Sequence, residues 1–133
     1  MKIIIPGIPV AKGRPRLSKY GTYTPAKTVN YEKLVKHYYM DQAEGIKLSG
    51  PIRIAIYLFF PIPKSYSKKQ VELIKTQGMV HTKKPDISNC LKSIEDALNA
   101  LAYDDDSQIV EIMAWKWYTL EEPRAEVYIE EVE

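Results

Sequence analysis

The strongest constraint on the fold is an amphipathic helix in the second half of the chain. Five apolar residues recur at spacings of 4, 3, 4 and 3 and form one stripe, Ile87, Leu91, Ile94, Leu98 and Leu101. Pro85 and Asp86 come directly before the stripe, and both are typical of a helix start. The spacing therefore predicts a helix that begins at Asp86 and carries Lys92 on its polar side, about two turns on.

The rest of the chain predicts a sheet around this helix. The segment 52–60 (IRIAIYLFF) is rich in β-forming residues and suits a largely buried strand. We predict an edge strand over 2–10, a loop over 11–25, helices over 28–44 and 68–76 (the second capped by Ser67), a loop over 77–85, and strands over 108–118 and 124–131. The order β-α-β-α-α-β-β predicts an α+β fold, with a mixed β-sheet packed with helices in a single domain over 1–133.

The charges are divided between the two parts of the chain. Residues 1–84 hold 16 Lys/Arg against 4 Asp/Glu, whereas residues 85–133 hold 3 against 13. A basic region attracts a polyanion such as DNA, and a concentrated acidic region can bind divalent metal. The alternative is that the two regions form complementary faces that neutralise each other.

Other features narrow the class of protein. No apolar run approaches the roughly 20 residues that span a bilayer, and the N-terminus lacks the pattern of a signal peptide. The single cysteine, Cys90, allows no internal disulfide. We therefore expect a cytoplasmic protein without membrane partners.

Asp86 and the run Asp104–Asp106 are the candidates for chemistry. Asp86 alone is explained as an N-cap worth about 1 kcal/mol, and an acidic run in a plain loop is simply solvated. Carboxylates from separate segments are nevertheless what Mg²⁺ binds together with phosphate oxygens. Combined with the basic part of the chain, they indicate metal-assisted phosphodiester hydrolysis.

Two longer segments resemble a known family. The segment KPDISNCLKSIEDALNALAYDDDSQIVE (84–111) resembles the central signature of the RusA family of Holliday junction resolvases, in which Asp-x-Asp-Asn is followed by a Lys, an Asp-Ala-Leu and an Asp-Asp-x-Gln. The segment GIPVAKGRPRLSKYGTYTPAKTVNYE (7–32) is similar to the opening segment of the same family. The resemblance implies a RusA-like fold and a Mg²⁺-dependent endodeoxyribonuclease, with Mn²⁺ as a substitute metal. Such an enzyme acts in recombination and repair: it binds branched DNA as a homodimer and resolves Holliday junctions by paired symmetric cleavage.

The resemblance also implies roles for single residues. Asp86 and Asp106 match carboxylates of the family's metal site, and Asp105 matches an acidic neighbour. Lys92 matches the essential lysine, which would stabilise charge on the scissile phosphate or orient the attacking water. The alternative for Lys92 is a solvated lysine on the polar face of the helix.

One position departs from the family pattern. Ser88 stands where the family has its second carboxylate, so the site lacks a full negative charge. Asp104 or Asp105 are the first candidates to replace it, ahead of Glu111 and Asp96. The departure leaves three readings open: a working site with altered ligands, a weakened enzyme, or a branched-DNA-binding protein without catalysis. A further alternative, from another class, is an acidic-faced interaction module whose basic part serves solubility.

The basic segments are candidates for DNA binding. Their cations are expected to contact backbone phosphates, which position DNA without reading its sequence. These residues are Lys12, Arg14 and Arg16 in the first loop and Lys83 and Lys84 before Asp86. The alternative is a solvated basic loop.

Overall fold

The computed structural model describes the backbone of all 133 residues and every side chain except that of Arg16. The elements follow in the order β1 (Lys2–Pro6), β2 (Arg16–Ser18), β3 (Gly21–Tyr23), α1 (Ala26–Ala43), β4 (Ile52–Pro61), α2 (Lys68–Thr76), α3 (Ile87–Leu98), a 3₁₀ turn η1 (Asp106–Gln108), β5 (Ile109–Thr119) and β6 (Arg124–Glu131).

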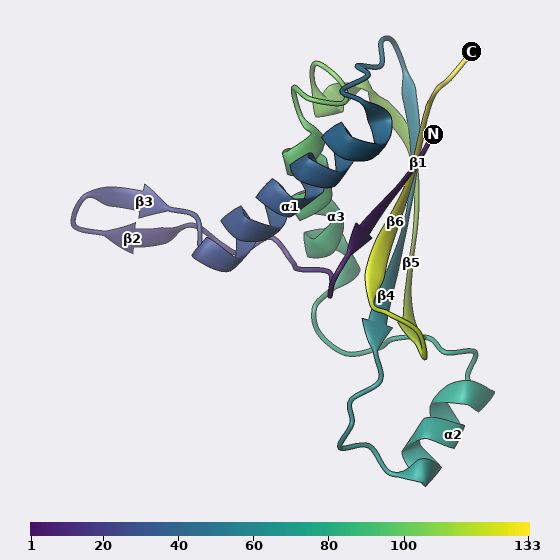
Figure 1. Cartoon of the computed structure of the whole chain (residues 1–133). Coiled ribbons are helices and arrows are strands. Elements are labelled where there is room, and N and C mark those ends of the chain that lie inside the picture. The colour runs from purple at the N-terminus through teal and green to yellow at the C-terminus, as the bar shows by residue number, and fades with distance from the viewer.

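Four strands form the central sheet, in the order β1-β6-β4-β5. Strand β4 pairs antiparallel with β6 and parallel with β5, and β1 pairs antiparallel with β6. Helices α1 and α3 cover one face of this sheet (Figure 1). The predicted α+β class with a mixed sheet is therefore confirmed.

The core lies between this sheet and the two helices. Alternate residues of β4 point into it and are fully or almost fully buried, from Ile52 to Phe60. On α3 the buried residues are Cys90, Ser93, Ile94, Ala97 and Leu98, whereas Ile87 and Leu91 are only partly buried. Leu101, also partly buried, lies beyond the helix, which ends at Leu98. The predicted stripe therefore faces the core, but the centre of the buried face of α3 lies closer to Cys90 than to Ile87 and Leu91. Burial raises the pKa of that thiol to about 11, so Cys90 is an inert core residue.

Two sequence predictions about the N-terminal region need correction. The first strand ends at Pro6 and not at residue 10, because Gly7 follows with a φ of 100° and turns the chain away. Residues 11–25 are not a plain loop: β2 and β3 form an antiparallel hairpin within them. This hairpin projects from the body of the molecule (Figure 1).

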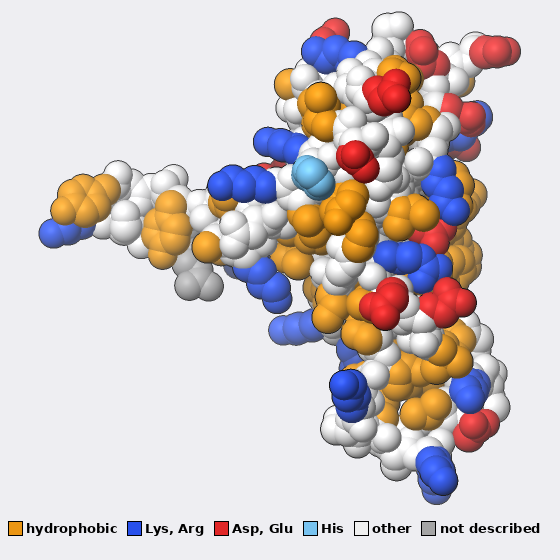
Figure 2. Space-filling view, in the orientation of Figure 1, with side chains coloured by type: hydrophobic (Ala, Val, Ile, Leu, Met, Phe, Trp, Pro, Cys, Tyr) orange, Lys and Arg blue, Asp and Glu red, His pale blue; other side chains and the backbone are white. Residues whose placement is uncertain are grey.

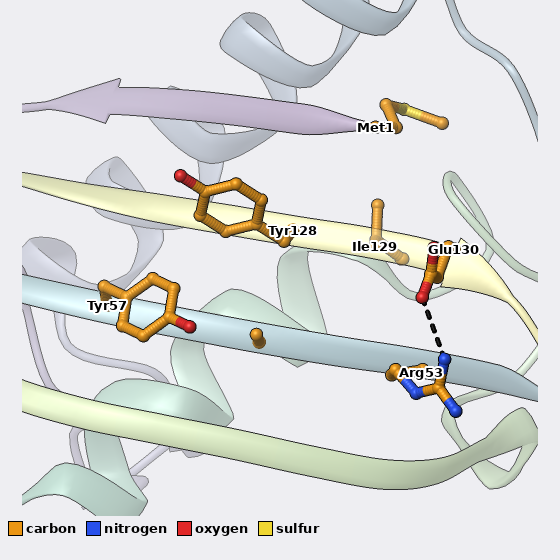
Figure 3. Close-up of a pocket in the computed structure, with 7 residues that line it drawn as sticks. Met1, Arg53, Tyr57, Tyr128, Ile129 and Glu130 are labelled. Carbon is orange, nitrogen blue, oxygen red and sulfur yellow. Dashed lines mark hydrogen bonds and ion pairs between the residues drawn. The ribbon is translucent and has the colours of Figure 1, made fainter.

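The second face of the sheet is not covered by either helix (Figure 1). It carries a row of aromatic side chains, among which Trp115 and Trp117 stack with ring centroids 5.3 Å apart. Figure 3 shows Tyr57 and Tyr128 on this face beside the pair formed by Arg53 and Glu130 (2.9 Å). Trp115 and Trp117 share one face of β5, which fits either the core or a subunit interface, and the exposure of Trp115, which is about half exposed, excludes the core for that residue.

No helix in the described part of the chain is long and apolar enough to cross a membrane.

Candidate active site

Asp86 begins α3 and caps it. Its two carboxylate oxygens accept hydrogen bonds from the backbone N–H of Asn89 (2.9 Å) and from the Asn89 side-chain amide (3.1 Å). The N-cap role is therefore confirmed, and it fixes the direction of the carboxylate. Asp86 lies on the wall of a 620 Å³ cavity that is also lined by residues 8–11, Lys27, Lys84 and Asn89.

Lys116 holds the loop before Asp86 against the sheet. It lies on the helix-covered side of β5, in register with Leu58. Its Nζ donates hydrogen bonds to the backbone carbonyls of Lys83 (2.7 Å) and Pro85 (2.6 Å). The position of the Lys83–Asp86 segment therefore depends on one lysine that sequence reasoning missed. Its only signal is that it is the single cation of a mainly apolar strand.

Asp106 lies beside the other end of α3. Its backbone N–H donates to Oδ1 of Asn99 (3.0 Å), which follows the last residue of the helix. Asp106 and Glu95 line a 260 Å³ cavity together with residues 109–112 of β5. Burial raises the pKa of Glu95, and the carboxylates of Asp106 and Asp96 raise it further, while Lys92 opposes the rise. Negative charge is thus concentrated at this point.

Glu95 was not among the residues selected from the sequence. It follows Lys92 by three residues and Ser88 by seven, so all three lie along one side of α3. Ser88 and Lys92 are both exposed on this side. The helical spacing was visible in the sequence, but the approach of Asp106 to Glu95 depends on how the chain returns after the helix.

Asp104 and Asp105 have local partners. Asp104 pairs with Lys47 (2.9 Å). The carboxylate of Asp105 accepts a hydrogen bond from the backbone N–H of Ser107 (3.1 Å) and caps η1. Hydrogen bonds from the Ser107 hydroxyl and backbone hold the pKa of Asp105 below its ordinary value.

Asp86 and Asp106 are not brought together within one chain. Glu95, the neighbour of Asp106, is nine residues from Asp86, which is roughly 13 Å along a helix axis. The two aspartates line different cavities. Among the described residues, no group of three or more His, Cys, Asp or Glu side chains is close enough to hold a metal ion.

The predicted DNA-binding cations differ in their surroundings. Lys12 is partly buried and pairs with Glu32 (2.6 Å) and Asp96 (3.2 Å), and hydrogen bonds to those carboxylates raise its pKa despite burial. Arg14, Lys83 and Lys84 are exposed and form no ion pair with any side chain that the structure describes. The side chain of Arg16 lies outside the described part.

His81, in the loop before the site, is a packing residue. It is buried between the rings of Phe60 and Tyr118, with centroid distances of 4.3 and 4.7 Å. Burial and the nearby Lys116 cation lower its pKa to about 4, so the imidazole is neutral near pH 7.

Comparison with known proteins identifies the family. The model of the endodeoxyribonuclease RusA family matches residues 6–130. The chain belongs to the RusA endodeoxyribonuclease family. It is also 38% identical over 138 residues to the uncharacterized protein YqaN of Bacillus subtilis (strain 168), and the alignment covers 99% of this chain and 96% of YqaN. The resemblance read from residues 84–111 and 7–32 is thus confirmed. As a family, RusA nucleases cleave DNA and depend on divalent metal.

Proposed function

We propose that this RusA-family chain is a Mg²⁺-dependent endodeoxyribonuclease of the cytoplasm. It binds four-way DNA as a homodimer and resolves Holliday junctions by paired symmetric cleavage in recombination and repair. The observation that carries the proposal, besides family membership, is that Lys92 lies along α3 between two acidic ends of the helix. Asp86 caps the first turn of α3, and Glu95 and Asp106 line a cavity at its other end.

The donor set at the second end fits a magnesium ion. Mg²⁺ commonly takes one or two carboxylates and fills its remaining positions with water and phosphate oxygens. Asp106 and Glu95 supply two carboxylates. Burial is the main cause of the raised pKa of Glu95, and the negative charge of Asp106 and Asp96, which a cation would compensate, raises it further. Glu95 thereby supplies the charge that Ser88 lacks. Asp105, in the adjacent turn, would add negative charge near the ion and would not bind it directly.

An unpaired strand edge supports the homodimer. Strand β5 lies at the edge of the sheet, and the loop containing Met79, Val80 and His81 bonds only to its last residues, 116–118. Residues 109–115 therefore present free backbone groups, and Val110, Ile112 and Met113 are exposed beside them. Such an apolar edge is a template for another strand. We propose that β5 pairs antiparallel with β5 of a second copy about a two-fold axis at Ile112.

This pairing would complete the metal site. Antiparallel pairing centred on Ile112 sets residue 109 of the second copy opposite residue 115 of the first. Lys116 already holds Pro85, and with it Asp86, beside this end of the strand. Asp86 of one copy would then approach Asp106 and Glu95 of the other. The proposed Mg²⁺ site thus combines Asp86 and Asp106 across the interface.

The remaining residues have roles at the scissile phosphate. Bound Mg²⁺ would make its water more acidic and would neutralise charge on the phosphate. Lys92 adds a fixed positive charge, which stabilises the negative charge that develops in the transition state. Arg14, Lys83, Lys84 and Lys27 would contact backbone phosphates, so binding is expected to weaken strongly with salt. Lys12 instead orders the root of the hairpin through Glu32 and Asp96.

Ser88 motivates a second candidate, a branched-DNA-binding protein with weak or absent catalysis. A hydroxyl replaces a carboxylate on the exposed side of α3. If Glu95 does not replace that charge, metal affinity and cleavage rate will both be low.

Cleavage of a synthetic four-way junction and of a matched linear duplex in Mg²⁺ separates the two candidates. We expect wild-type protein to nick only the junction, and Asp106→Asn and Glu95→Gln to bind it without nicking. Glu121→Gln, in the distant turn between β5 and β6, serves as the control and should cleave normally. A wild-type protein that binds junctions but never nicks them, together with a Ser88→Asp variant that does, would establish the second candidate.

A further inference from the structure

The hairpin formed by β2 and β3 is a positively charged arm. Residues 11–25 contain four Lys or Arg and no Asp or Glu. Figure 2 shows the arm standing away from the body, with basic and apolar side chains at its far end. Because the described cations beyond its root, Arg14 and Lys19, form no ion pair with a described side chain, the arm favours a polyanionic partner.

The same arm exposes large apolar side chains. Leu17 is 85% exposed, Tyr20 88% and Tyr23 50%. Burying side chains of this size is favourable, and a two-stranded hairpin is too small to bury them within itself. By contrast, Tyr31, Tyr39 and Tyr103 are buried in the core. The arm therefore combines cations with aromatic and aliphatic side chains that remain largely exposed.

The tip holds Tyr20 in a defined position. Ser18 pairs with Gly21, so Lys19 and Tyr20 form a two-residue turn. The Ser18 hydroxyl donates to the Gly21 carbonyl (3.0 Å) and accepts from the Tyr20 N–H (3.2 Å), and Gly21 takes a φ of 114°. The ammonium of Lys19 lies 5.2 Å from the centre of the Tyr20 ring. The farthest point of the arm is thus an aromatic ring with a cation beside it.

The root of the arm is fixed next to the candidate active site. The Lys12 N–H donates to the Asn89 carbonyl (2.8 Å), and the Gly13 N–H donates to Oγ1 of Thr28 (2.9 Å). Asn89 also binds Asp86 through its own N–H and side chain. A Cβ at Gly13 would lie 2.8 Å from Pro25, so glycine allows the two sides of the root to approach. The arm therefore has a set position relative to Asp86.

We propose that this arm is a wedge that stacks on exposed nucleobases at the branch point of a DNA junction, with Tyr20 and Leu17 on the bases and Arg14 and Lys19 on the flanking phosphates. The proposal rests on the proposed function, since it names what the same protein does to its DNA. A base that stacks on an aromatic side chain strengthens binding about 5- to 150-fold. In a linear duplex this contact first requires unstacking, which costs a few kcal/mol per step. Bases at a branch point are already open on one side, so the arm favours junctions over duplexes.

Junction binding with 2-aminopurine at the branch point tests the wedge. With the wild-type protein in Ca²⁺, we expect 2-aminopurine fluorescence to change at the branch point and not at a position ten pairs along an arm. Tyr20→Ser should lower junction affinity about 5- to 150-fold, remove the signal and leave duplex affinity unchanged. Tyr20→Phe should behave as wild type. Leu17→Ser should weaken junction binding, whereas Leu120→Ser, at a 69% exposed leucine in the β5–β6 turn, should not.

Several results would overturn the wedge. If Tyr20→Ser binds the junction as wild type does with the same signal, the proposed function stands and the wedge does not. Equal loss of junction and duplex affinity would make Tyr20 a general contact and would reject the wedge. A wild-type protein with no preference for junctions over duplexes would reject both proposals. Melting temperatures equal to that of wild type show that each variant is folded.

Discussion

Replacing Lys116 with methionine removes the cation that holds the loop before Asp86. In the native chain its Nζ donates to two backbone carbonyls, those of Lys83 at 2.7 Å and Pro85 at 2.6 Å. Methionine retains most of the unbranched stem, so packing beside β4 is largely kept. The variant therefore isolates the loss of two charge-assisted hydrogen bonds.

The expected loss of stability follows from these contacts. A hydrogen bond to a charged group contributes about 1.5–3 kcal/mol, and the two share one donor, so we expect a total near 2 kcal/mol. For 133 residues, an unfolding entropy of about 2.1 cal/mol/K per residue gives about 0.28 kcal/mol/K. The melting temperature should therefore fall by about 7 °C.

Calorimetry and hydrogen exchange together measure this effect. Lys116→Met should melt about 7 °C below wild type, and the amides of residues 82–87 should exchange faster while those of β4 do not. Lys69→Met, at an exposed lysine of α2, is the control and should remain within about 2 °C of wild type. A Lys116→Met protein that melts like this control and protects residues 82–87 normally would refute the role assigned to Lys116.

Three further predictions concern Glu95, His81 and Ile112. Without metal at pH 7, Glu95→Gln should melt about 2 °C above wild type, because it removes a negative charge near Asp106. Mg²⁺ should raise the melting temperature of wild type but not that of Glu95→Gln. A wild-type melting temperature that does not change with Mg²⁺ would contradict the metal site. Folding lowers the pKa of His81 from 6.5 to about 4. As pH falls from 6.5 toward 4, His81 therefore becomes protonated in the unfolded chain but not in the folded chain, and the folded state loses stability. His81→Phe should lose about 1 kcal/mol less than wild type between pH 7 and 5, measured by urea unfolding, and an equal loss would contradict the buried neutral imidazole. Ile112→Lys places like charges opposite each other across the proposed two-fold axis. The variant should be a monomer by light scattering and should no longer bind Mn²⁺ by calorimetry, whereas the control Leu120→Lys should remain a dimer. A dimeric Ile112→Lys protein would reject the β5 interface.

The predictions from sequence succeeded where local signals are strong. Strand β6 and helix α2 have the predicted bounds, and Ser67 caps α2 by accepting from the Gln70 N–H. Asp86 caps α3 as its sequence position indicates. These features depend on residues within a few positions of one another. The hairpin was missed because Lys19–Tyr20 lacks the Asn-Gly or Asp-Gly signal of a two-residue turn.

The site was harder to read because its parts meet through topology. Asp86 and Asp106 were expected around one ion, but α3 separates them within a chain. The importance of Glu95 and Lys116 becomes visible only when the loop after α3 and the loop before it are in place. The substitution at Ser88 could be recognised from the family pattern. Glu95 lies two turns later on the same side of α3, and only the structure shows that it is close to Asp106.

Cleavage of a supercoiled plasmid that extrudes a cruciform tests the central claim most directly. In Mg²⁺, a dimer that cuts both strands symmetrically within one binding event converts the plasmid to the linear form. A single nick releases the supercoiling, reabsorbs the cruciform and leaves an open circle. We predict linear plasmid from the wild-type protein and none from Asp106→Asn. Uncut plasmid, or open circle alone, from the wild-type protein would contradict the account of a dimeric, metal-dependent junction resolvase.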